Sequence, residues 1–435
     1  MRNAKLVTLI AGAFISLQAQ AVNLLQVYQD ALANDAVYAS ARANLSAGQE
    51  ASVQGRANLL PLIGLSGSNQ KITREDIPDT TSHGYTLSLS QPLFDIAAWQ
   101  TYEQSKLSVA ASEAAFASVQ QDLILRVSQA YFDVLTAQDA LTALQAQKVA
   151  ISEQLASAQR NFEVGTATIT DTHEAQSRYD LVVAQEFAAQ NDIDIKRSAL
   201  QQIIGKSPEN LAILRTDIEL RPPEPAQIAP WISSAEEQNY DVISKQLALE
   251  IAKRDITRNR AGHYPTVDLV ASRGNTNQRN TVLGQTSTGT TNTVGVQWAI
   301  PLFSGFAVTS QVRQAIALED KARSDLEISR RTAALNARQS YLGVHSGLAQ
   351  VKALQAAEIS SQSSLESNRL GYQVGVRINI DVLNAQQQLY LTQRDLAKTR
   401  YDTIMNSLRL KSAAGTLQEK DIVQINTILV EPAQR

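Results

Sequence analysis

Residues 162–171 of the chain read FEVGTATITD, and 210 positions later residues 372–381 read YQVGVRINID. The match continues at the same offset, with Ala175 against Ala385, Leu181 against Leu391 and Gly205 against Gly415. Solenoid repeats have periods of about 20 to 50 residues, so this long period indicates a duplicated half-protein instead. We therefore expect the two halves of the chain to build the same unit.

Each half follows one plan. A helical stretch, at about 23–57 and 231–260, is followed by two strand-like runs, a very long helix, a Val-Gly turn and a return helix that ends in Gly. A cluster of prolines marks the join between the halves. The predicted organisation is a signal peptide at 1–21, a first repeat at 22–206, a Pro-rich linker at 207–230, a second repeat at 231–415 and a C-terminal tail at 416–435.

The first residues have the pattern of a secretory signal. Arg2 and Lys5 precede a short apolar run at 6–17, and residues 19–21 form a cleavage site of the A-x-A type. A membrane anchor is the alternative, but a spanning helix needs roughly 20 apolar residues. We expect cleavage before Val22, and no later segment is long and apolar enough to predict a spanning helix.

The composition excludes several classes of protein. The chain has no cysteine, which rules out disulfides, thiolate catalysis and the lipid-bearing cysteine of a lipoprotein. Its net charge of −3 gives no reason to expect nucleic acid as a partner. The four histidines lack metal-ligand spacing, and no nucleophile–base set or phosphate-binding loop is visible. We therefore expect no metal, no cofactor and no enzyme activity.

An apolar seam predicts a very long helix in the first half. From Leu123 to Phe162, positions that step alternately by four and three residues are apolar, and only Lys148 interrupts them. This heptad pattern predicts coiled-coil packing. A helix over 97–162 is about 100 Å long, and the return helix at 170–204 is about half as long. We expect the shorter first helix of each half to stack on the return helix, so that the helices build a tube or a rod.

Two runs of the sequence alternate strictly between apolar and small polar residues, as strands do. These runs are 85–90 and 293–300, and their less regular partners are 59–69 and 264–272. The polar connections at 70–83 and 273–292 are expected to be exposed loops. The alternation fits either a half-buried soluble sheet or a membrane barrel with a wet lumen. The length of the runs favours the barrel, as do the aromatic residues at one end of them: Phe94, Trp99, Trp298, Phe303 and Phe306.

Four strands cannot close a barrel, and lipid tolerates no open sheet edge. Strands that enter a membrane must therefore be shared between chains. Two chains give about eight strands and a barrel filled by its own side chains, whereas three chains give about twelve strands and an open lumen. The residues themselves thus favour a secreted, oligomeric helical tube capped by a small shared barrel.

The paired turns in a duplicated frame, each with an Asp six residues after its Gly, resemble those of the TolC family of outer-membrane efflux proteins. The resemblance covers essentially the whole mature chain. It implies a mainly α fold with a small β part, in which a long coiled-coil helical barrel joins four strands per chain of a shared, roughly 12-stranded transmembrane β-barrel. It also implies a channel in the outer membrane of a Gram-negative bacterium that passes substrates of inner-membrane efflux pumps or type I secretion systems.

The resemblance also implies partners. They are two further copies in a homotrimer, a periplasmic adaptor (membrane fusion) protein that opens the periplasmic end, an inner-membrane pump and outer-membrane lipid; no cofactor is implied. The alternative reading is a periplasmic coiled-coil adaptor or bridging protein without a pore. That alternative explains the heptads and the signal peptide but not the duplicated strand pairs.

Residue roles carried over from the family lie near the two turns. A latch that closes the periplasmic end falls on Thr170 and Asp171 of one hairpin and on Tyr372 and Arg377 of the other. An Arg–carboxylate pair with flanking hydroxyls suits a directional latch. The alternative reading of Thr170 and Asp171 is that they only cap the return helix.

A ring of carboxylates at the narrowest point falls on Asp381, where like charges concentrate cations. Asn384 stands where a second Asp is common, so a trimer has about three charges there instead of six and a weaker grip on cations. The alternative reading of Asp381 is another helix-capping Asp.

The turns themselves are the expected docking tips for an adaptor. They consist of Val164, Gly165 and Thr166 in the first half and Val374, Gly375 and Val376 in the second. As structure alone, each Gly is expected to supply the positive φ that a helix–helix turn needs.

Overall fold

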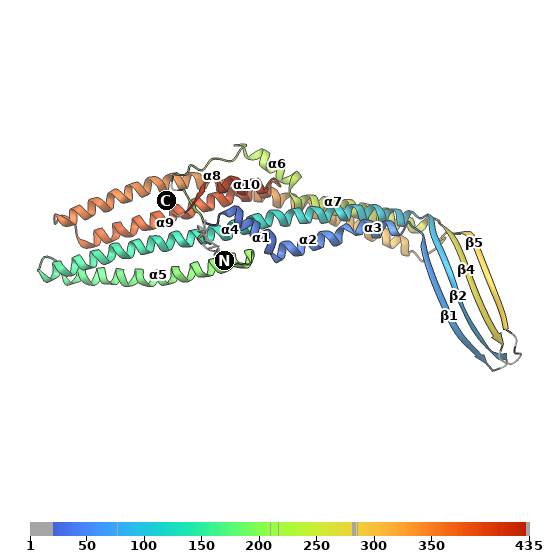
Figure 1. The fold of residues 1–435 in the computed structure, drawn as a ribbon. Coiled ribbons are helices and arrows are strands. Elements are labelled where there is room, and N and C mark those ends of the chain that lie inside the picture. Colours follow the sequence, from blue (N-terminus) through green and yellow to red (C-terminus); the bar gives the residue numbers. More distant parts are fainter. Residues whose placement is uncertain are drawn as a thin grey trace, which may run out of the picture.

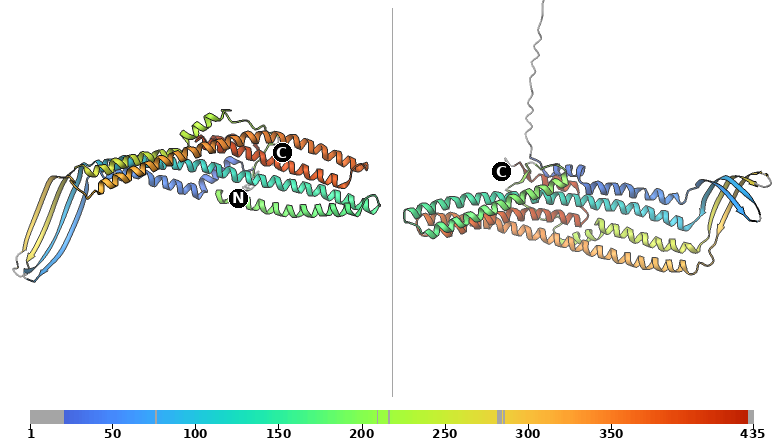
Figure 2. Two further views of the ribbon diagram at one scale, coloured as in Figure 1. Left: turned by 180° about the vertical axis from the view of Figure 1, so that it is seen from behind. Right: turned by 90° about the horizontal axis from the view of Figure 1, so that it is seen from below.

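The computed structural model describes residues 21–431 except 76, 209, 216, 281–283 and 285. The predicted signal peptide lies outside the described residues apart from Ala21. The molecule is long and narrow: helices form most of its length, four strands bend away at one end, and two helical hairpins point to the other end (Figure 1). The described chain starts and ends near the middle of this length (Figures 1 and 2).

The two halves contribute the same series of elements. The first half contains α1 (Leu24–Asn34), α2 (Ala36–Gln49), α3 (Ala51–Ala57), β1 (Leu62–Arg74), β2 (Ile77–Phe94), α4 (Ile96–Glu163) and α5 (Ile169–Ile204). The second half contains α6 (Ile228–Gln238), α7 (Tyr240–Arg260), the 3-10 turn η1 (Ala261–His263), β4 (Thr266–Asn280), β5 (Thr286–Ala299), α8 (Ala307–Gln373) and α9 (Asn379–Ala413). The linker holds β3 (Ile213–Leu214), and α10 (Glu419–Asn426) and β6 (Leu429–Val430) follow the second half.

The very long helices are confirmed. α4 has 68 residues and α8 has 67, so each is about 100 Å long. The predicted seam of α4 is largely buried, with Leu123 and Val127 fully inaccessible. Lys148, which interrupts the seam, forms an ion pair of 2.5 Å with Glu186 of α5. The polar residue in the seam therefore joins the two helices of the hairpin.

The helical stretch predicted at 23–57 is confirmed, and it is divided into the three helices α1, α2 and α3. Asp35 ends α1 by donating its backbone N–H to Ala31 O at 2.8 Å, and its carboxylate accepts from Tyr38 N at 2.7 Å to start α2. Asn239 divides α6 from α7 in the same way, with its side chain capping α7. A short polar side chain competes for backbone groups, which is why a helix breaks at such residues.

The expected end-to-end stacking of helices is confirmed. α1 meets the end of α5, where Lys206 and Asp30 form an ion pair of 2.8 Å. α1, α2 and α3 continue the line of α5 along α4 (Figures 1 and 2). The shorter helices therefore take the place of α5 beside α4 where α5 ends.

The four long strands form one antiparallel sheet in the order β1-β2-β4-β5. Most of the residues predicted as loops at 70–83 and 273–292 lie in strands instead, because β1 and β2 pair from Leu62 to Arg74 and β4 and β5 pair from Thr266 to Arg279. Residues 76, 281–283 and 285 of these two stretches lie outside the described residues. The Thr, Ser and Asn residues that suggested loops lie instead in strands with little apolar surface to bury. β-branched Thr is in any case favourable in a strand.

The predicted alternation gives the sheet two different faces. Facing residues share a side of an antiparallel pair, so the register places most of the large apolar side chains on one face, which we call the apolar face; Leu62, Ile72 and Val270 lie on the opposite face. It carries Ile63, Leu65, Tyr85, Leu87, Leu89, Leu269, Val294, Val296 and Trp298. The opposite small-residue face carries Gly64, Ser66, Gly84, Thr86, Ser88, Gly274, Thr293 and Gly295. A Cβ on Gly84 would come within 2.5 Å of Asn275 O, so the backbone of β4 leaves no room for a side chain at this position of β2.

The main core lies at the waist, midway along the molecule. Tyr131 and Phe132 of α4 are fully buried there against α1, α5, α9, α10 and the short sheet of β3 and β6. The Tyr131 hydroxyl donates to Ala212 O at 2.6 Å, which ties the linker to α4. Within the described ranges, none of the helices combines the length and the apolar character needed to cross a bilayer.

Candidate functional site

The two hairpin turns lie side by side at the end of the molecule farthest from the sheet (Figures 1 and 2). Gly165 and Gly375 both have φ of 79°, which confirms the predicted reason for glycine. The backbones match as well, since Thr166 N donates to Asn161 O and Val376 N donates to Gly371 O. The turns present Val164, Val374 and Val376 to solvent, with 73%, 65% and 75% of their surface exposed.

Thr170 and Asp171 lie in the first turn of α5. The Asp171 carboxylate accepts from the backbone N–H of Thr168 at 3.0 Å and from its hydroxyl at 2.8 Å. The capping role that was the alternative reading of Asp171 is thus confirmed. Within one chain, no described contact joins Arg377 to Thr170 or Asp171.

Arg377 and Asp381 interact with each other instead. The guanidinium and the carboxylate are 3.7 Å apart on successive turns of the chain, and both are partly exposed. α9 begins without a side-chain cap, so the capping alternative for Asp381 is wrong. Arg377 also lies over Gly371, where an added Cβ would be 2.6 Å from Arg377 Cγ.

A polar network joins the two hairpins near their tips. The Asn161 amide donates to the Tyr372 hydroxyl at 3.1 Å. The Asn379 side chain accepts from Gln154 at 2.5 Å and donates to Asp171 O at 3.1 Å. Asn379 is only 1% exposed, so loss of either hydrogen bond would leave a buried polar group unsatisfied and destabilise the contact between the hairpins.

Arg178 of α5 makes the second link between the hairpins. Its two terminal nitrogens donate to Gln387 Oε1 at 2.7 Å and to Asn384 Oδ1 at 3.1 Å, both on α9. Asn384 is therefore bound by an arginine of the other hairpin. We call these contacts of Gln154, Asn161, Arg178, Tyr372, Asn379, Asn384 and Gln387 the inter-hairpin network.

Sequence reasoning found Tyr372 and Asn384 but missed the other members of this network. A usable signal was the mismatch between copies, since Asn379 corresponds to Ile169 and Arg178 to Gln388 at the 210-residue offset. A polar side chain in place of an apolar one, or a charged side chain in place of a neutral one, in only one copy is not needed for the scaffold that both copies share.

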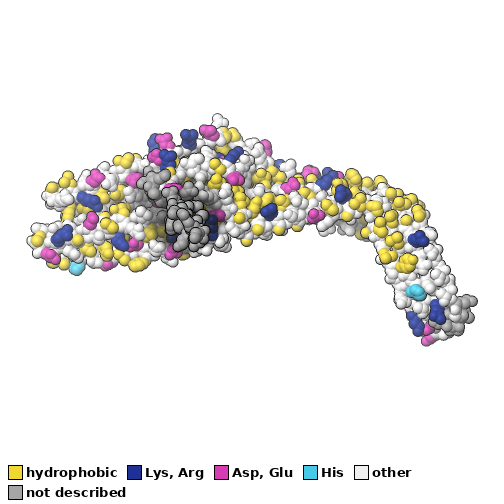
Figure 3. Space-filling view, viewed as in Figure 1, with side chains coloured by type: hydrophobic (Ala, Val, Ile, Leu, Met, Phe, Trp, Pro, Cys, Tyr) yellow, Lys and Arg dark blue, Asp and Glu magenta, His cyan; other side chains and the backbone are white. Residues whose placement is uncertain are grey.

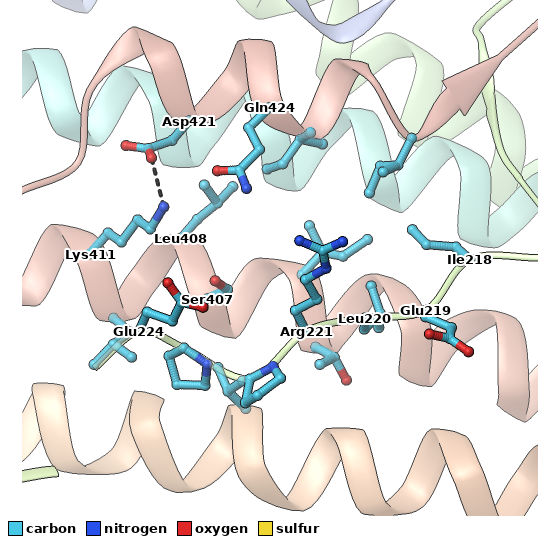
Figure 4. A pocket seen from close by; sticks show the side chains of 18 of the residues that line it. Ile218, Glu219, Leu220, Arg221, Glu224, Ser407, Leu408, Lys411, Asp421 and Gln424 are labelled. Carbon is cyan, nitrogen blue, oxygen red and sulfur yellow. Dashed lines mark hydrogen bonds and ion pairs between the residues drawn. The ribbon is translucent and has the colours of Figure 1, made fainter. Parts of the chain in front are cut away.

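A cavity of 890 Å³ lies at the waist, between the linker, α9 and α10. Charged side chains of both signs line it, and Lys411 binds the almost fully buried Asp421 at 2.7 Å (Figure 4). Glu219, Arg221 and Glu224 enter from the linker (Figure 4). No group of three or more His, Asp and Glu residues able to hold a metal ion occurs in the part of the chain that the structure describes.

The fold and the hairpin tips define a class of protein. A sheet that is apolar on one face and lined by small polar residues on the other suits a barrel wall between lipid and a wet lumen. Helices of about 100 Å continue this wall far beyond the roughly 30 Å of a bilayer core. The chain is thus a subunit of a membrane channel with a long helical extension.

The chain belongs to the outer membrane efflux protein family, whose model matches residues 27–206 and 231–416. It is 33% identical over 446 residues to Outer membrane protein TolC of Escherichia coli, covering 98% of the chain and 89% of that protein. It is 35% identical over 452 residues to Alkaline protease secretion protein AprF of Pseudomonas aeruginosa, covering 99% and 93%. The predicted resemblance is confirmed.

Solved structures share the fold. The outer membrane protein VceC of Vibrio cholerae superposes with a TM-score of 0.79 at 18% identity, covering 90% of this chain and 96% of that one. The protein is therefore an outer-membrane channel for efflux and type I secretion, and it extends from the outer membrane of a Gram-negative bacterium into the periplasm.

Proposed function

We propose that three copies of this chain join edge to edge into one continuous tube. The observation that carries this proposal is that the chain has two unpartnered edges along its whole length. The sheet ends at β1 on one side and β5 on the other, and an open edge is not tolerated in lipid. Three chains supply about twelve strands, enough for an open lumen.

The helices support the same assembly. α5 continues the side of β1 and α8 continues the side of β5 (Figure 2). Exposed apolar residues follow α8 at heptad spacing, at Ile328, Leu335 and Leu342. α5 also exposes Leu181, Phe187 and Ile195. Such rows suit coiled-coil contacts between neighbouring copies along the two free edges.

We further propose that the inter-hairpin network holds the periplasmic entrance closed and that adaptor and pump open it. Charge-assisted bonds from Arg178 and the buried amide of Asn379 give the closed form directional contacts. The latch predicted from the sequence is proposed to act together with this network; it consists of Thr170, Asp171, Tyr372 and Arg377. In this proposal the Arg377 side chain leaves Asp381 and binds a neighbouring copy. The tips at 164–166 and 374–376 are the proposed docking points, because they expose apolar side chains to the periplasm.

Asp381 is proposed to form the narrow ring, together with Asn384. The nearby Arg377 offsets part of its charge, and Asn384 adds none. In planar bilayers, Asp381→Ala is expected to relieve block by multivalent cations, and Asn384→Asp to deepen it. If neither substitution changes the block, the ring lies elsewhere.

Residues 1–21 are proposed to be a cleaved signal peptide. Val22 supports this, because its backbone N–H donates to Asn210 O at 2.9 Å and its carbonyl accepts from Ala212 N, so the proposed mature chain starts inside an ordered bridge. Sequencing the amino terminus of protein from outer membranes tests the site. A mature chain that begins at any residue other than Val22 contradicts it.

The proposed cargo includes secreted polypeptides as well as small molecules. This rests on the similarity to AprF, whose name describes alkaline protease secretion, alongside TolC. In a strain that lacks AprF, expression of this chain together with its cognate pump and adaptor should restore protease export. Export in the absence of that pump would contradict the proposed partnership.

A further inference from the structure

The apolar face of the sheet does not stay apolar along its length. Its large side chains lie near the helices, and toward the loop end the face becomes polar and charged (Figure 3). On β2 the residues that follow Tyr85 on this face are His83, Thr81 and Asp79. On β4 the first residue beyond Ala271 is Arg273. A polar band therefore sits directly above the lipid-facing band.

One row of this band has the composition of an anion site. Lys71 of β1 faces Thr81 of β2, and Thr81 faces Arg279 of β4. Strands are about 4.8 Å apart, so the two cationic residues start roughly 10 Å apart with a hydroxyl between them. Lys and Arg side chains are long enough to converge on one group above the threonine.

The charges in this band are only partly neutralised. Lys71 pairs with Asp79 at 3.0 Å while keeping 64% of its side chain exposed. The side chains of Arg279 and Arg273 are exposed, and neither side chain makes a hydrogen bond or ion pair with another described residue. Among the described residues of this face, Asp79 is the one acid on β1, β2 and β4 beyond the apolar band. The band is therefore net cationic in each chain.

We infer that this row, Lys71 with Thr81 and Arg279, binds a phosphate group of the phosphorylated glycolipid in the outer leaflet of the outer membrane, with Arg273 at the edge of the hydrocarbon. The inference rests on the proposed trimeric barrel, which turns the apolar face toward lipid. The helices lie in the periplasm, so the loop end of the sheet faces the cell exterior, and that leaflet is built from phosphorylated glycolipid.

The chemistry of the row fits this ligand. A guanidinium binds two phosphate oxygens with its planar fork, and a lysine adds a point charge. The threonine hydroxyl can donate to a third oxygen. Asp79 keeps Lys71 oriented above the row in the absence of lipid. The row is continuous with the apolar part of the same face, which contacts the acyl chains of the lipid. One surface therefore binds both the head group and the acyl chains.

The test uses full-length trimers purified from outer membranes. Lys71→Ala combined with Arg279→Ala should weaken binding of phosphorylated lipid A about tenfold in native mass spectrometry, the effect of losing charge-assisted bonds. The matched control is Gln70→Ala with Gln278→Ala, at the adjacent positions on the small-residue face, and it should bind as the wild type does. Lys71→Arg with Arg279→Lys keeps the charges and should also retain binding.

Two further arms identify the ligand. Dephosphorylated lipid A should bind wild-type trimers as weakly as phosphorylated lipid A binds the double alanine variant. Equal affinity for phosphatidylglycerol, or unchanged glycolipid binding by the double alanine variant, would overturn the inference. Conductance of the same preparations separates the two proposals: a conducting trimer with unchanged binding overturns only the lipid site, whereas a wild type that forms no trimeric pore overturns the barrel and the lipid site together.

Discussion

Asp35 performs two functions with one side chain. It separates α1 from α2, and its carboxylate receives two hydrogen bonds from Arg126 of α4, at 3.0 and 3.1 Å. Burial raises the pKa of Asp35, but the bonds from Arg126 and from the Tyr38 backbone outweigh burial and leave the pKa below its usual value. The lowered pKa means that the folded protein favours the charged carboxylate.

This pair predicts a pH-dependent loss of stability. Because the folded pKa lies below the unfolded value of about 3.9, the contribution is complete above that value and disappears as the pH falls through the folded pKa. Arg126→Met should cost about 3 kcal/mol at neutral pH, since it leaves a buried carboxylate unpaired. Thermal dissociation of trimers, followed on gels from pH 7 downward, should show the gap to wild type closing below about pH 4.

The control for this prediction is Arg215→Met. Arg215 pairs with Asp217 at 3.2 Å, but both side chains are at least half exposed. Exposed pairs contribute little. Equal destabilisation by the two substitutions would show that burial of Asp35 is not the cause.

Single residues also mark the limit of what could be predicted from the sequence. The positive φ of Gly165 and Gly375 follows from the turn itself, because the signal is local. Asn379 was missed because its importance depends on Gln154 and Asp171, which lie more than 200 positions away and on another hairpin. Without an alignment or a fold, nothing in the neighbourhood of Asn379 distinguishes it from a surface asparagine.

At the scale of elements, α8 and α9 approach so closely that one position admits only glycine. A Cβ on Gly347 would lie 2.3 Å from Thr403 Oγ1. Gly347→Ala should therefore destabilise the helix pair by about 1–3 kcal/mol, as overpacking does. Adding Thr403→Ala removes the clashing hydroxyl and should restore most of the loss in thermal dissociation.

Gly289 of β5 is the control for that prediction. No heavy atom lies within 4 Å of a Cβ at this position, so Gly289→Ala should leave stability unchanged or slightly raised. If the double substitution at 347 and 403 is no more stable than Gly347→Ala alone, the helices are not held apart by this contact.

Elements differed in how well the sequence predicted them. The heptad seam located the C-terminal end of α4 to within one residue, because a 3.5-residue period sustained for many turns has few other interpretations. The predicted strands were shorter than the observed ones, because their polar ends were assigned to loops. In a barrel, both lumen and lipid-head-group regions are wet, so polar composition does not distinguish a strand from a loop there.

At the scale of the whole molecule, the useful feature for an experiment is that the sequence contains no cysteine. The absence of cysteine allows a direct test of the closed entrance. Cysteines at Gln154 and Asn379, whose side chains are in contact, should be joined by a short bifunctional maleimide. Treated cells should lose export and treated trimers should lose the conductance gain caused by adaptor and pump.

The control pair places cysteines at Lys321 and Asp325, which contact each other within α8. Linking these two leaves the hairpins free to separate, and export should continue. Export that persists after complete linking of 154 to 379 would contradict opening by separation of the hairpins.

The interruption of helices at the waist has a mechanical consequence. α4 and α8 run through the whole length of the molecule. The row of helices beside α4 is interrupted where α1 meets the end of α5, at the ion pair of Lys206 with Asp30. When the hairpins are twisted, the junction between α1 and α5 can deform, so that less of the twist reaches the strands. We therefore expect the periplasmic half to twist more easily at this level than a tube of unbroken helices would.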